Sequence, residues 1–285
     1  MLVVTHSGKF HADDIVAWSL LCTFLPNKNA LQLTRTRDPL IIEKADIVFD
    51  VGDIYDPKQK RFDHHQRSYT GFLSSAGMVL QWLHDEKYIS QKLFETLHHN
   101  LVDDVDKVDN GLRTPDSPCF STLIGWLNTG CNTFEEFDAA FLQGSAIAEK
   151  LIAHLVLGQQ IQEQAEKTVL LEMTLAMEQN RNWLEFTEYL PWKSTYFQND
   201  GQHHPTEFTI FPTMQGTWQV VCIPPEANSM EQKRSLPEEW AGLRDEELSK
   251  ITEAQGIFCH KNRFIAVFTT KEDLFKAMRK FHLLT

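Results

Sequence analysis

Phe62-Asp63-His64-His65-Gln66 places an acid and two adjacent imidazoles where a short apolar run is expected to end as a β-strand. An acid followed by two imidazoles at the end of a strand rarely occurs by chance, so these polar side chains are expected to have a function. It predicts a metal site, because carboxylates and imidazoles are common ligands of divalent ions.

Three further clusters of acids or imidazoles lie in the first half of the chain. The apolar run Leu2-Val3-Val4-Thr5 leads into residues 6–14, which contain two imidazoles and two carboxylates. Residues 47–53 form an apolar run that ends on acids, and residues 105–111 place acids ahead of a glycine turn. Clusters at successive strand ends are the pattern that a parallel sheet produces when its C-terminal edge carries a site.

The mixture of ligand types narrows the choice of metal. Carboxylates and imidazoles without a nearby thiolate suit Mn²⁺, Mg²⁺, Fe²⁺ or Co²⁺ better than structural zinc. More than four candidate ligands imply more than one ion. Two divalent ions about 3.5–4 Å apart promote in-line attack on phosphorus. Hydrolysis of a phosphoester or phosphoanhydride is therefore the expected chemistry.

These motifs resemble those of a known group of enzymes. His6-x4-His11-x-Asp13, Asp50, Asp63-His64-His65 and Val108-Asp109-Asn110-Gly111 are similar to the four ordered motifs of the DHH phosphoesterase superfamily, which includes RecJ-type exonucleases and family II pyrophosphatases.

The motifs of this chain resemble one branch of that superfamily more closely than the others. The opening Thr5–Asp14 segment, Ser74-Ser75-Ala76-Gly77 and the downstream run from Leu236 to Glu246 resemble the Myg family. The resemblance spans nearly the whole chain. Studied eukaryotic members of that family are described as 3′-to-5′ RNA exonucleases, so it implies the same activity here.

The resemblance also implies a set of ligands for two divalent ions. His6, His11 and Asp13 would hold the first ion, Asp50 would bridge, and His64 and Asp109 would complete the shell of the second. Asp53 remains an alternative to Asp50, and Asp106 an alternative to Asp109, because the members of each pair are three residues apart. Mn²⁺ is the expected metal, with Mg²⁺, Fe²⁺ or Co²⁺ as alternatives.

Two further residues are expected to act in catalysis. His65 would contact phosphate or protonate the leaving oxygen, and Asp63 would orient a histidine ring. The first motif departs from many superfamily members, which carry Asp-x-Asp where this chain has His11-Ala12-Asp13. One anionic ligand fewer would shift the metal preference.

The pattern of apolar runs predicts an α/β fold in three parts. Residues 1–130 would form the DHH-type catalytic domain, a mostly parallel sheet flanked by helices. Residues 131–190 would form a long connecting helix, with Gly144 and Gly158 as candidate breaks. Within the first part, strands are expected near 2–5, 31–35, 46–51 and 61–64, and helices near 13–24, 75–84 and 90–107.

Residues 191–285 are expected to form a smaller α+β domain that binds substrate. Its strands are predicted as hairpins around Gly216 and Asn262. In the resembled family such a domain contributes contacts to phosphate or sugar, which here would come from Arg234, Arg244, His260, Lys261 and Arg263. Relatives commonly carry Gly-Gly after a strand where this chain has residues 264–267, a departure that bears on substrate identity.

Composition sets limits on substrate and location. The net charge of −12 provides no basic face for a long duplex, so short substrates or chain ends are favoured. No stretch of about 18 apolar residues and no leader segment are evident, so we expect a cytoplasmic protein that does not bind membranes. The five cysteines are scattered, which indicates reduced thiols.

Three functions follow, in order of preference. The first is a two-metal 3′-to-5′ exonuclease acting on single-stranded RNA or short oligonucleotides. The second is a small nucleotide or phosphoanhydride hydrolase that uses the same site. The third is a non-catalytic metal-binding scaffold, which the intact ligands at every motif argue against. Homodimerisation is left open.

Overall fold

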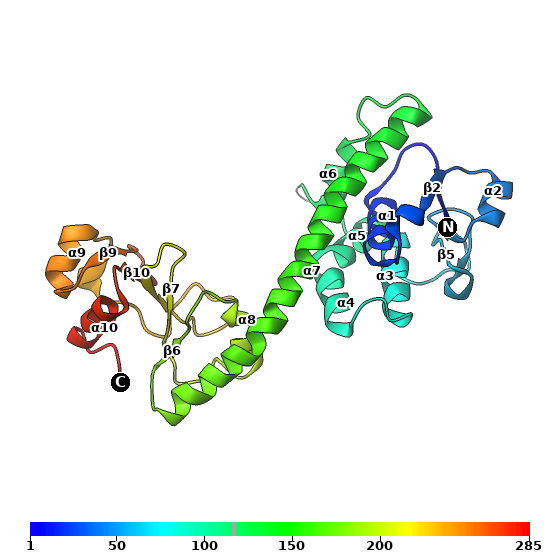
Figure 1. Cartoon of the computed structure of the whole chain (residues 1–285). Coiled ribbons are helices and arrows are strands. Elements are labelled where there is room, and N and C mark those ends of the chain that lie inside the picture. Colours follow the sequence, from blue (N-terminus) through cyan, green and yellow to red (C-terminus); the bar gives the residue numbers. More distant parts are fainter. Residues whose placement is uncertain (116–117) are drawn as a thin grey trace. The chain divides into compact units, whose positions relative to one another are not determined.

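The computed structural model describes residues 1–115 and 118–285, which divide into two compact units, Met1–Gln159 and Gln160–Thr285 (Figure 1). Each unit has its own five-stranded sheet. The boundary lies within a long helix rather than near residue 130 or 190, and the predicted three-part division stays a prediction.

The first unit contains a mixed sheet with strand order β2-β1-β3-β5-β4. Its strands are β1 (Leu2–Thr5), β2 (Gln32–Arg35), β3 (Ile47–Phe49), β4 (Tyr55–Asp56) and β5 (Arg61–Phe62). Neighbours in the series β2-β1-β3-β5 are parallel, and only β4 runs antiparallel to its neighbour β5. The mostly parallel sheet is confirmed, and β4 was not predicted.

Helices cover both faces of this sheet. Those longer than one turn are α1 (Ala12–Phe24), α2 (Pro39–Lys44), α3 (Ser75–Asp85), α4 (Gln91–Leu97), α5 (Asp103–Asp109) and α6 (Phe120–Trp126). A π-helical stretch, His98–Val102, joins α4 to α5, so the helix predicted near 90–107 is a continuous helical path in three pieces. Single 3-10 turns lie at Lys28–Ala30 and Pro57–Gln59.

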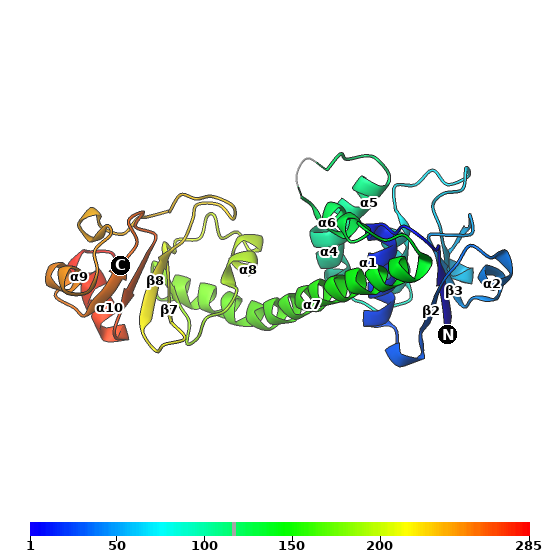
Figure 2. The ribbon, with the colours of Figure 1, turned by 90° about the horizontal axis from the view of Figure 1, so that it is seen from above.

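Two cores explain why the strands read as apolar runs rather than alternating ones. Val4 and Val48 pack with Ala45 and Val51 beneath α2, whereas Val3, Ile47 and Phe49 pack into the larger core with α1 and α3. Figure 2 shows α1 and α2 on opposite sides of β2 and β3. A strand that is covered on both faces buries every side chain, as β3 does.

Helix α7 (Phe134–Glu178) is one uninterrupted helix of 45 residues, so the predicted breaks at Gly144 and Gly158 are wrong. A glycine costs a helix only about 1 kcal/mol, which long flanking segments can outweigh. At Gly144 the missing side chain also permits close packing, since a Cβ would lie 3.1 Å from Cδ1 of Ile15.

The same helix is long and apolar enough to cross a membrane by length and composition alone. Its most apolar 18-residue window has a mean hydropathy of 1.3 and is 33% buried. Helix α7 is therefore an exception to the expectation that no such stretch exists. Core helices of soluble proteins pass the same test, and α7 contributes Phe141 and Ile152 to the first core and Val169 to a core of the second unit.

The second unit is the expected smaller α+β region. Its sheet has the order β6-β7-β8-β10-β9, with β6 (Trp183–Glu185), β7 (Phe208–Pro212), β8 (Trp218–Cys222), β9 (Gly256–Cys259) and β10 (Ile265–Phe268). Its helices are α8 (Trp192–Gln198), α9 (Asp245–Thr252) and α10 (Lys271–Lys280), with a 3-10 turn at Glu238–Trp240. Strand β6 lies within the predicted connector, so this sheet begins before residue 191.

Candidate metal centre

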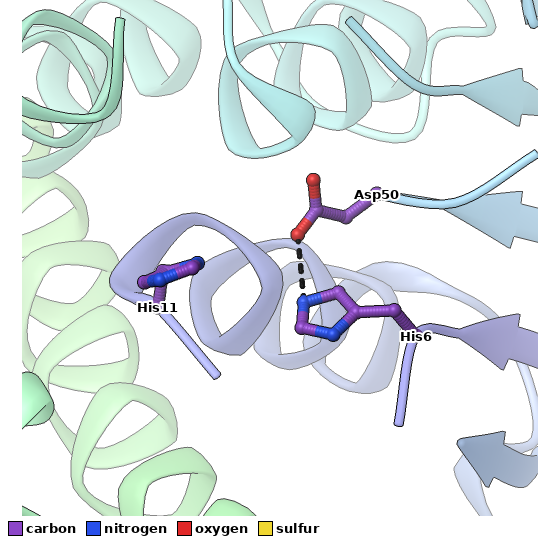
Figure 3. A group of neighbouring side chains, drawn as sticks. All are labelled: His6, His11 and Asp50. Carbon is purple, nitrogen blue, oxygen red and sulfur yellow. Dashed lines mark ion pairs between the residues drawn. The ribbon is translucent and has the colours of Figure 1, made fainter. Parts of the chain in front are cut away.

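The polar clusters of the first unit gather at one edge of its sheet. Strands β1, β3 and β5 are parallel, so the residues that follow them emerge side by side. The chain passes from β1 through α1 to β2 on one side, while β3 lies on the other side of β1. Such a reversal opens a crevice at the carboxyl ends of the two central strands. His6 follows β1 and Asp50 follows β3, and Figure 3 shows them facing each other across this crevice.

His6 stands between two buried acids. Its Nε2 atom lies 3.1 Å from Oδ2 of Asp14 and 3.2 Å from Oδ2 of Asp50. Burial acts to lower the pKa of His6, but the two carboxylates outweigh burial and raise that pKa to about 10. Oδ2 of Asp14 has no aligned hydrogen-bond donor, so we attribute the Asp14 pairing to charge rather than to a directed hydrogen bond.

Asp13, at the start of α1, is fully buried and its two carboxylate oxygens have no hydrogen-bond partner. Burial, followed by repulsion from Asp50, Asp109 and Asp14, raises the pKa of Asp13 well above its usual range. An unpaired buried carboxylate is strongly unfavourable unless a cation compensates it. The donors around Asp13 therefore fit a bound metal ion.

His64 points its Nε2 atom into the same group of acids. That atom lies 3.2 Å from Oδ2 of Asp109, 3.6 Å from Oδ1 of Asp50 and 3.9 Å from Oδ2 of Asp13. It is buried and makes no aligned hydrogen bond. The other ring nitrogen, Nδ1, lies 3.3 Å from Oδ1 of Asn110, which holds the ring from behind. A ring nitrogen surrounded by carboxylates and oriented by a distal partner is typical of a metal ligand.

The ligand atoms form three overlapping groups, each with its atoms within 4.8 Å of one another. The groups are His6-His11-Asp50, Asp50-His64-His65 and His11-Asp13-Asp109. Figure 3 shows the first of them, with the His11 ring at the start of α1 turned toward Asp50 and His6. Asp50 and His11 each belong to two groups, as expected of residues between two ions. All six residues predicted as ligands lie in this cluster, and their role as ligands stays a prediction.

For each of the two pairs of acids that the sequence left open as ligands, the structure distinguishes one member from the other. Asp50 is buried in the cluster, whereas Asp53 is exposed. Asp109 contacts His64, whereas Asp106 accepts hydrogen bonds from the Ser74 backbone N–H and hydroxyl and from the Gly77 backbone N–H. Asp106 thus stabilises the start of α3, and burial raises its pKa to about 6 despite those bonds. The geometry favours Asp50 and Asp109 as the ligands.

His65 and Asp63 lie as their expected roles require. The Nδ1 atom of His65 is 2.7 Å from Oδ1 of Asp63, and the same oxygen accepts the backbone N–H of His65 at 3.1 Å. Asp63 is buried, and its Oδ2 accepts the backbone N–H of Asp53 at 2.7 Å. The side chain of His65 is 59% exposed. Asp63 therefore fixes a ring that remains accessible to a substrate.

Sequence reasoning did not assign a role to Asp14. Its buried carboxylate accepts the backbone N–H of His11 through Oδ1 at 3.2 Å and pairs with His6 through Oδ2. The available signal was its position, three residues after His11, where an acid closes a capping box at a helix start. Asp14 therefore positions two candidate ligands at once.

The residues expected to bind substrate in the second unit contact other parts of that unit. Arg234 donates to Oε2 of Glu207 and to the carbonyls of His282 and Leu283, so its guanidinium ties down the C-terminal segment. The Arg244 guanidinium carbon lies 4.6 Å from the centre of the Phe258 ring. The structure leaves all five expected residues partly or wholly exposed: Arg234, Arg244, His260, Lys261 and Arg263. The substrate contacts of all five stay predictions.

Comparison with known proteins places the chain among relatives of similar length. It is 36% identical over 280 residues to a MYG1 protein of Chlamydia pneumoniae, covering 96% of this chain and 94% of that protein. It is 31% identical over 311 residues to the MYG1 exonuclease of Homo sapiens, covering 94% of this chain and 82% of that protein.

A solved structure of RecJ with Mn²⁺ from Thermus thermophilus is 13% identical. The match covers 98% of this chain and 51% of that one, with a TM-score of 0.29. The model of the family MYG1_exonuc, described as "Uncharacterised protein family (UPF0160)", matches residues 2–281. With nearly its whole length matched, the chain belongs to the MYG1 exonuclease family.

Proposed function

We propose that this protein is a divalent-metal-dependent phosphodiesterase that shortens single-stranded RNA or short oligonucleotides from the 3′ end. The observation that carries the proposal is the cluster around Asp13, Asp50 and His64, where buried carboxylate and imidazole atoms converge without enough internal partners. The reaction class is further supported by relatives that are named exonucleases.

The donor set fits two divalent ions. His6, His11 and Asp13 would hold one ion and His64 and Asp109 the other, with Asp50 between them. When bound, two such ions would generate a hydroxide nucleophile from water and neutralise charge on the phosphoryl oxygens. Mn²⁺ suits a mixed set of imidazoles and carboxylates, with Mg²⁺, Fe²⁺ and Co²⁺ as alternatives.

The protein's own residues would supply orientation and a proton. His65 is exposed at the edge of the cluster, and its Nδ1 is engaged by Asp63, so the remaining ring nitrogen, Nε2, is available to the substrate. We propose that Nε2 contacts a phosphate oxygen or donates a proton to the leaving oxygen. Asp63 would be a positioning residue, since it holds both the ring and the backbone of His65.

The charge of the chain supports a short footprint on the substrate. A net charge of −12 provides little attraction for the phosphates of a long duplex. Two bound ions would return about four positive charges to the cluster, enough to attract a strand end. Chain ends and short oligonucleotides are therefore the proposed substrates.

Digestion of a 5′-labelled single-stranded RNA tests this function. The reactions would contain Mn²⁺, Mg²⁺ or a chelator, and would compare the wild type with His64→Ala and with the control His203→Ala, which alters an exposed histidine of the second unit. We expect a ladder that shortens from the 3′ end, requires metal, and is lost only in His64→Ala. Absence of digestion by a protein that binds metal would refute the exonuclease and point to nucleotides or phosphoanhydrides.

A further inference from the structure

Two cavities of the first unit meet at the candidate metal ligands. One has a volume of about 480 Å³ and the other about 790 Å³. His11, Asp50 and His65 line both cavities. A substrate with its scissile phosphate at this cluster would therefore have both cavities next to it.

The larger cavity contains two cations that the proposed chemistry does not use. Arg37 and Lys9 line it, and both side chains are exposed. Within residues 1–115 and 118–285, no acid lies at ion-pair distance from either of them. Of the acids in the same wall, Asp50 and Asp63 are engaged with histidines, and Asp53 is exposed.

The topology explains why Arg37 reaches this place. It follows β2, which runs parallel to β1, so it emerges at the same sheet edge as His6. Arg35, at the end of β2, has a different environment. Its guanidinium donates to Oδ1 of Asp138 and to the Gly8 carbonyl, each at 2.7 Å, and its side chain is only 3% exposed. Arg35 thus stabilises the fold, whereas Arg37 remains open to a ligand.

The two cavities differ in chemistry. Beyond the shared cluster, the larger cavity combines the two cations with an apolar wall that includes Pro39 and Ile42. The smaller cavity contains Pro115, Ser121 and Thr122, and none of its lining residues in the described part of the chain is a lysine or arginine. Among the described residues, a phosphate next to the scissile one would therefore find cationic partners in the larger cavity and none in the smaller.

We propose that Arg37 and Lys9 bind a second phosphate of the substrate, so that the site selects molecules with at least two phosphate groups. The planar guanidinium of Arg37 suits paired hydrogen bonds to phosphate oxygens, and Lys9 adds a point charge. Pro39 and Ile42 would pack against the attached nucleoside. This inference rests on the proposed function, because it places the first phosphate at the metal cluster.

Calorimetric titration tests the inference without turnover. The ligands are UpU with one phosphate, pUpU with a second phosphate as a terminal monoester, and UpUpU with a second phosphate as an internal diester. Each is titrated into the full chain with Ca²⁺ in place of Mn²⁺, and chromatography verifies that the ligand stays intact. The proteins are the wild type, Arg37→Gln, Arg37→Lys, Lys9→Gln and the control Lys44→Gln, which removes an exposed positive charge on α2 outside the cavity.

We expect the wild type and Lys44→Gln to bind at least one two-phosphate ligand roughly tenfold more tightly than UpU. That preference should fall to about twofold in Arg37→Gln, be intermediate in Arg37→Lys and also decline in Lys9→Gln. Preference for pUpU alone would identify a terminal phosphate, and preference for UpUpU would identify a neighbouring diester.

Equal affinity of the wild type for all three ligands would overturn the inference. The inference would also be overturned if Arg37→Gln and Lys9→Gln both kept the wild-type preference for two-phosphate ligands over UpU, with circular dichroism showing that both variants are folded. The proposed function is measured separately, by hydrolysis of pUpU and UpUpU with Mn²⁺. A protein that cleaves these ligands but binds all three equally refutes the second-phosphate subsite only, and one that shows the binding preference without cleaving either ligand refutes the phosphodiesterase only.

Discussion

The Nε2 atom of His6 lies 3.2 Å from Oδ2 of Asp50, across the gap between two neighbouring parallel strands. This pair marks the point where the strand order reverses, and every other candidate ligand is arranged around it. Asp50 adopts a backbone φ of 55°, a left-handed conformation that is uncommon for residues other than glycine, asparagine and aspartate. The tight turn after β3 thereby directs the carboxylate toward His6 and His64.

Metal binding is expected to stabilise the first unit. Asp13 and its neighbouring acids repel one another, and ions bound only to the folded chain relieve that repulsion. At a metal concentration of about 100 times Kd the gain is roughly 2.7 kcal/mol, which corresponds to about 5–10 °C in Tm. Scanning calorimetry with Mn²⁺ and with chelator measures it.

Asp13→Asn is the matched variant for that experiment. It removes the buried charge while preserving the shape of the side chain, so in chelator it should be more stable than the wild type. It should also gain less from Mn²⁺. An unchanged Tm of the wild type at saturating Mn²⁺ would show that the cluster holds no ion.

Stability of the metal-free protein should fall as the pH rises. The folded-state pKa of His6 is raised from 6.5 to about 10, so its contribution to stability is complete below pH 6.5 and is lost between pH 6.5 and about 10. The raised pKa of Asp13 acts in the same direction, because the folded state holds this proton to higher pH than the unfolded chain does.

Urea denaturation in chelator at pH 6.5 and pH 9.5 checks this dependence. In Asp14→Asn one of the two charges that raise the pKa of His6 is absent, so the loss of stability across that interval should be smaller than in the wild type. A wild-type protein that becomes more stable at the higher pH would contradict the assignment of His6 as a cation between two acids.

Gly77 is required by the close approach of Asp106. A Cβ on Gly77 would lie 2.2 Å from Oδ2 of Asp106, at the point where that carboxylate accepts the Gly77 backbone N–H. Gly77→Ala should therefore destabilise the first unit by about 1–3 kcal/mol, as overpacking does. The measurement is the free energy of unfolding of the first unit, obtained from chemical denaturation in which the two units unfold in separate transitions.

Gly125→Ala is the control for that substitution. Gly125 lies within α6, and a Cβ there would have no described atom within 4 Å. Alanine favours helix over glycine, so the expected change is neutral or stabilising by up to about 1 kcal/mol. Equal effects of the two substitutions would show that the contact between Gly77 and Asp106 does not constrain the fold.

The sequence predicted the parts of the fold that depend on hydrophobic pattern. Strands β1 and β3 and helix α1 are buried on nearly all sides, and the polar residues that follow the two strands identify the sheet edge. Strands β4 and β6 were missed because they have only two and three residues, which is too short to show a periodicity. Strand β6 is defined by its pairing with β7, where Trp183 lies opposite Phe208, and local sequence does not encode that pairing. Strand β4 pairs with the next strand in the chain, β5.

For the cluster, the pattern predicted which segments meet but not which acid of each segment turns inward. The choice between Asp50 and Asp53 depends on a turn with three positive φ angles, at Asp50, Gly52 and Asp53, and a periodic strand pattern does not predict such a turn. Asp106 was ambiguous because its partners, Ser74 and Gly77, lie far upstream in sequence. Asp14 was missed because its charge partner, His6, lies just after β1, and the sequence alone does not show that the start of α1 folds back against it.

The most direct test of the account compares Asp50→Asn with Asp53→Asn. Both residues have a φ of 55°, and asparagine tolerates this conformation, so the two variants are matched in backbone as well as in charge. The measurement is the initial rate of nucleotide release from the 3′ end of single-stranded RNA in Mn²⁺. We predict a loss of about 100-fold or more in Asp50→Asn, since even outer partners of metal ligands typically contribute 10–100-fold, and a change within about threefold in Asp53→Asn. Equal losses in both variants, or full activity in Asp50→Asn, would contradict the assignment of this sheet edge as the metal-dependent catalytic centre.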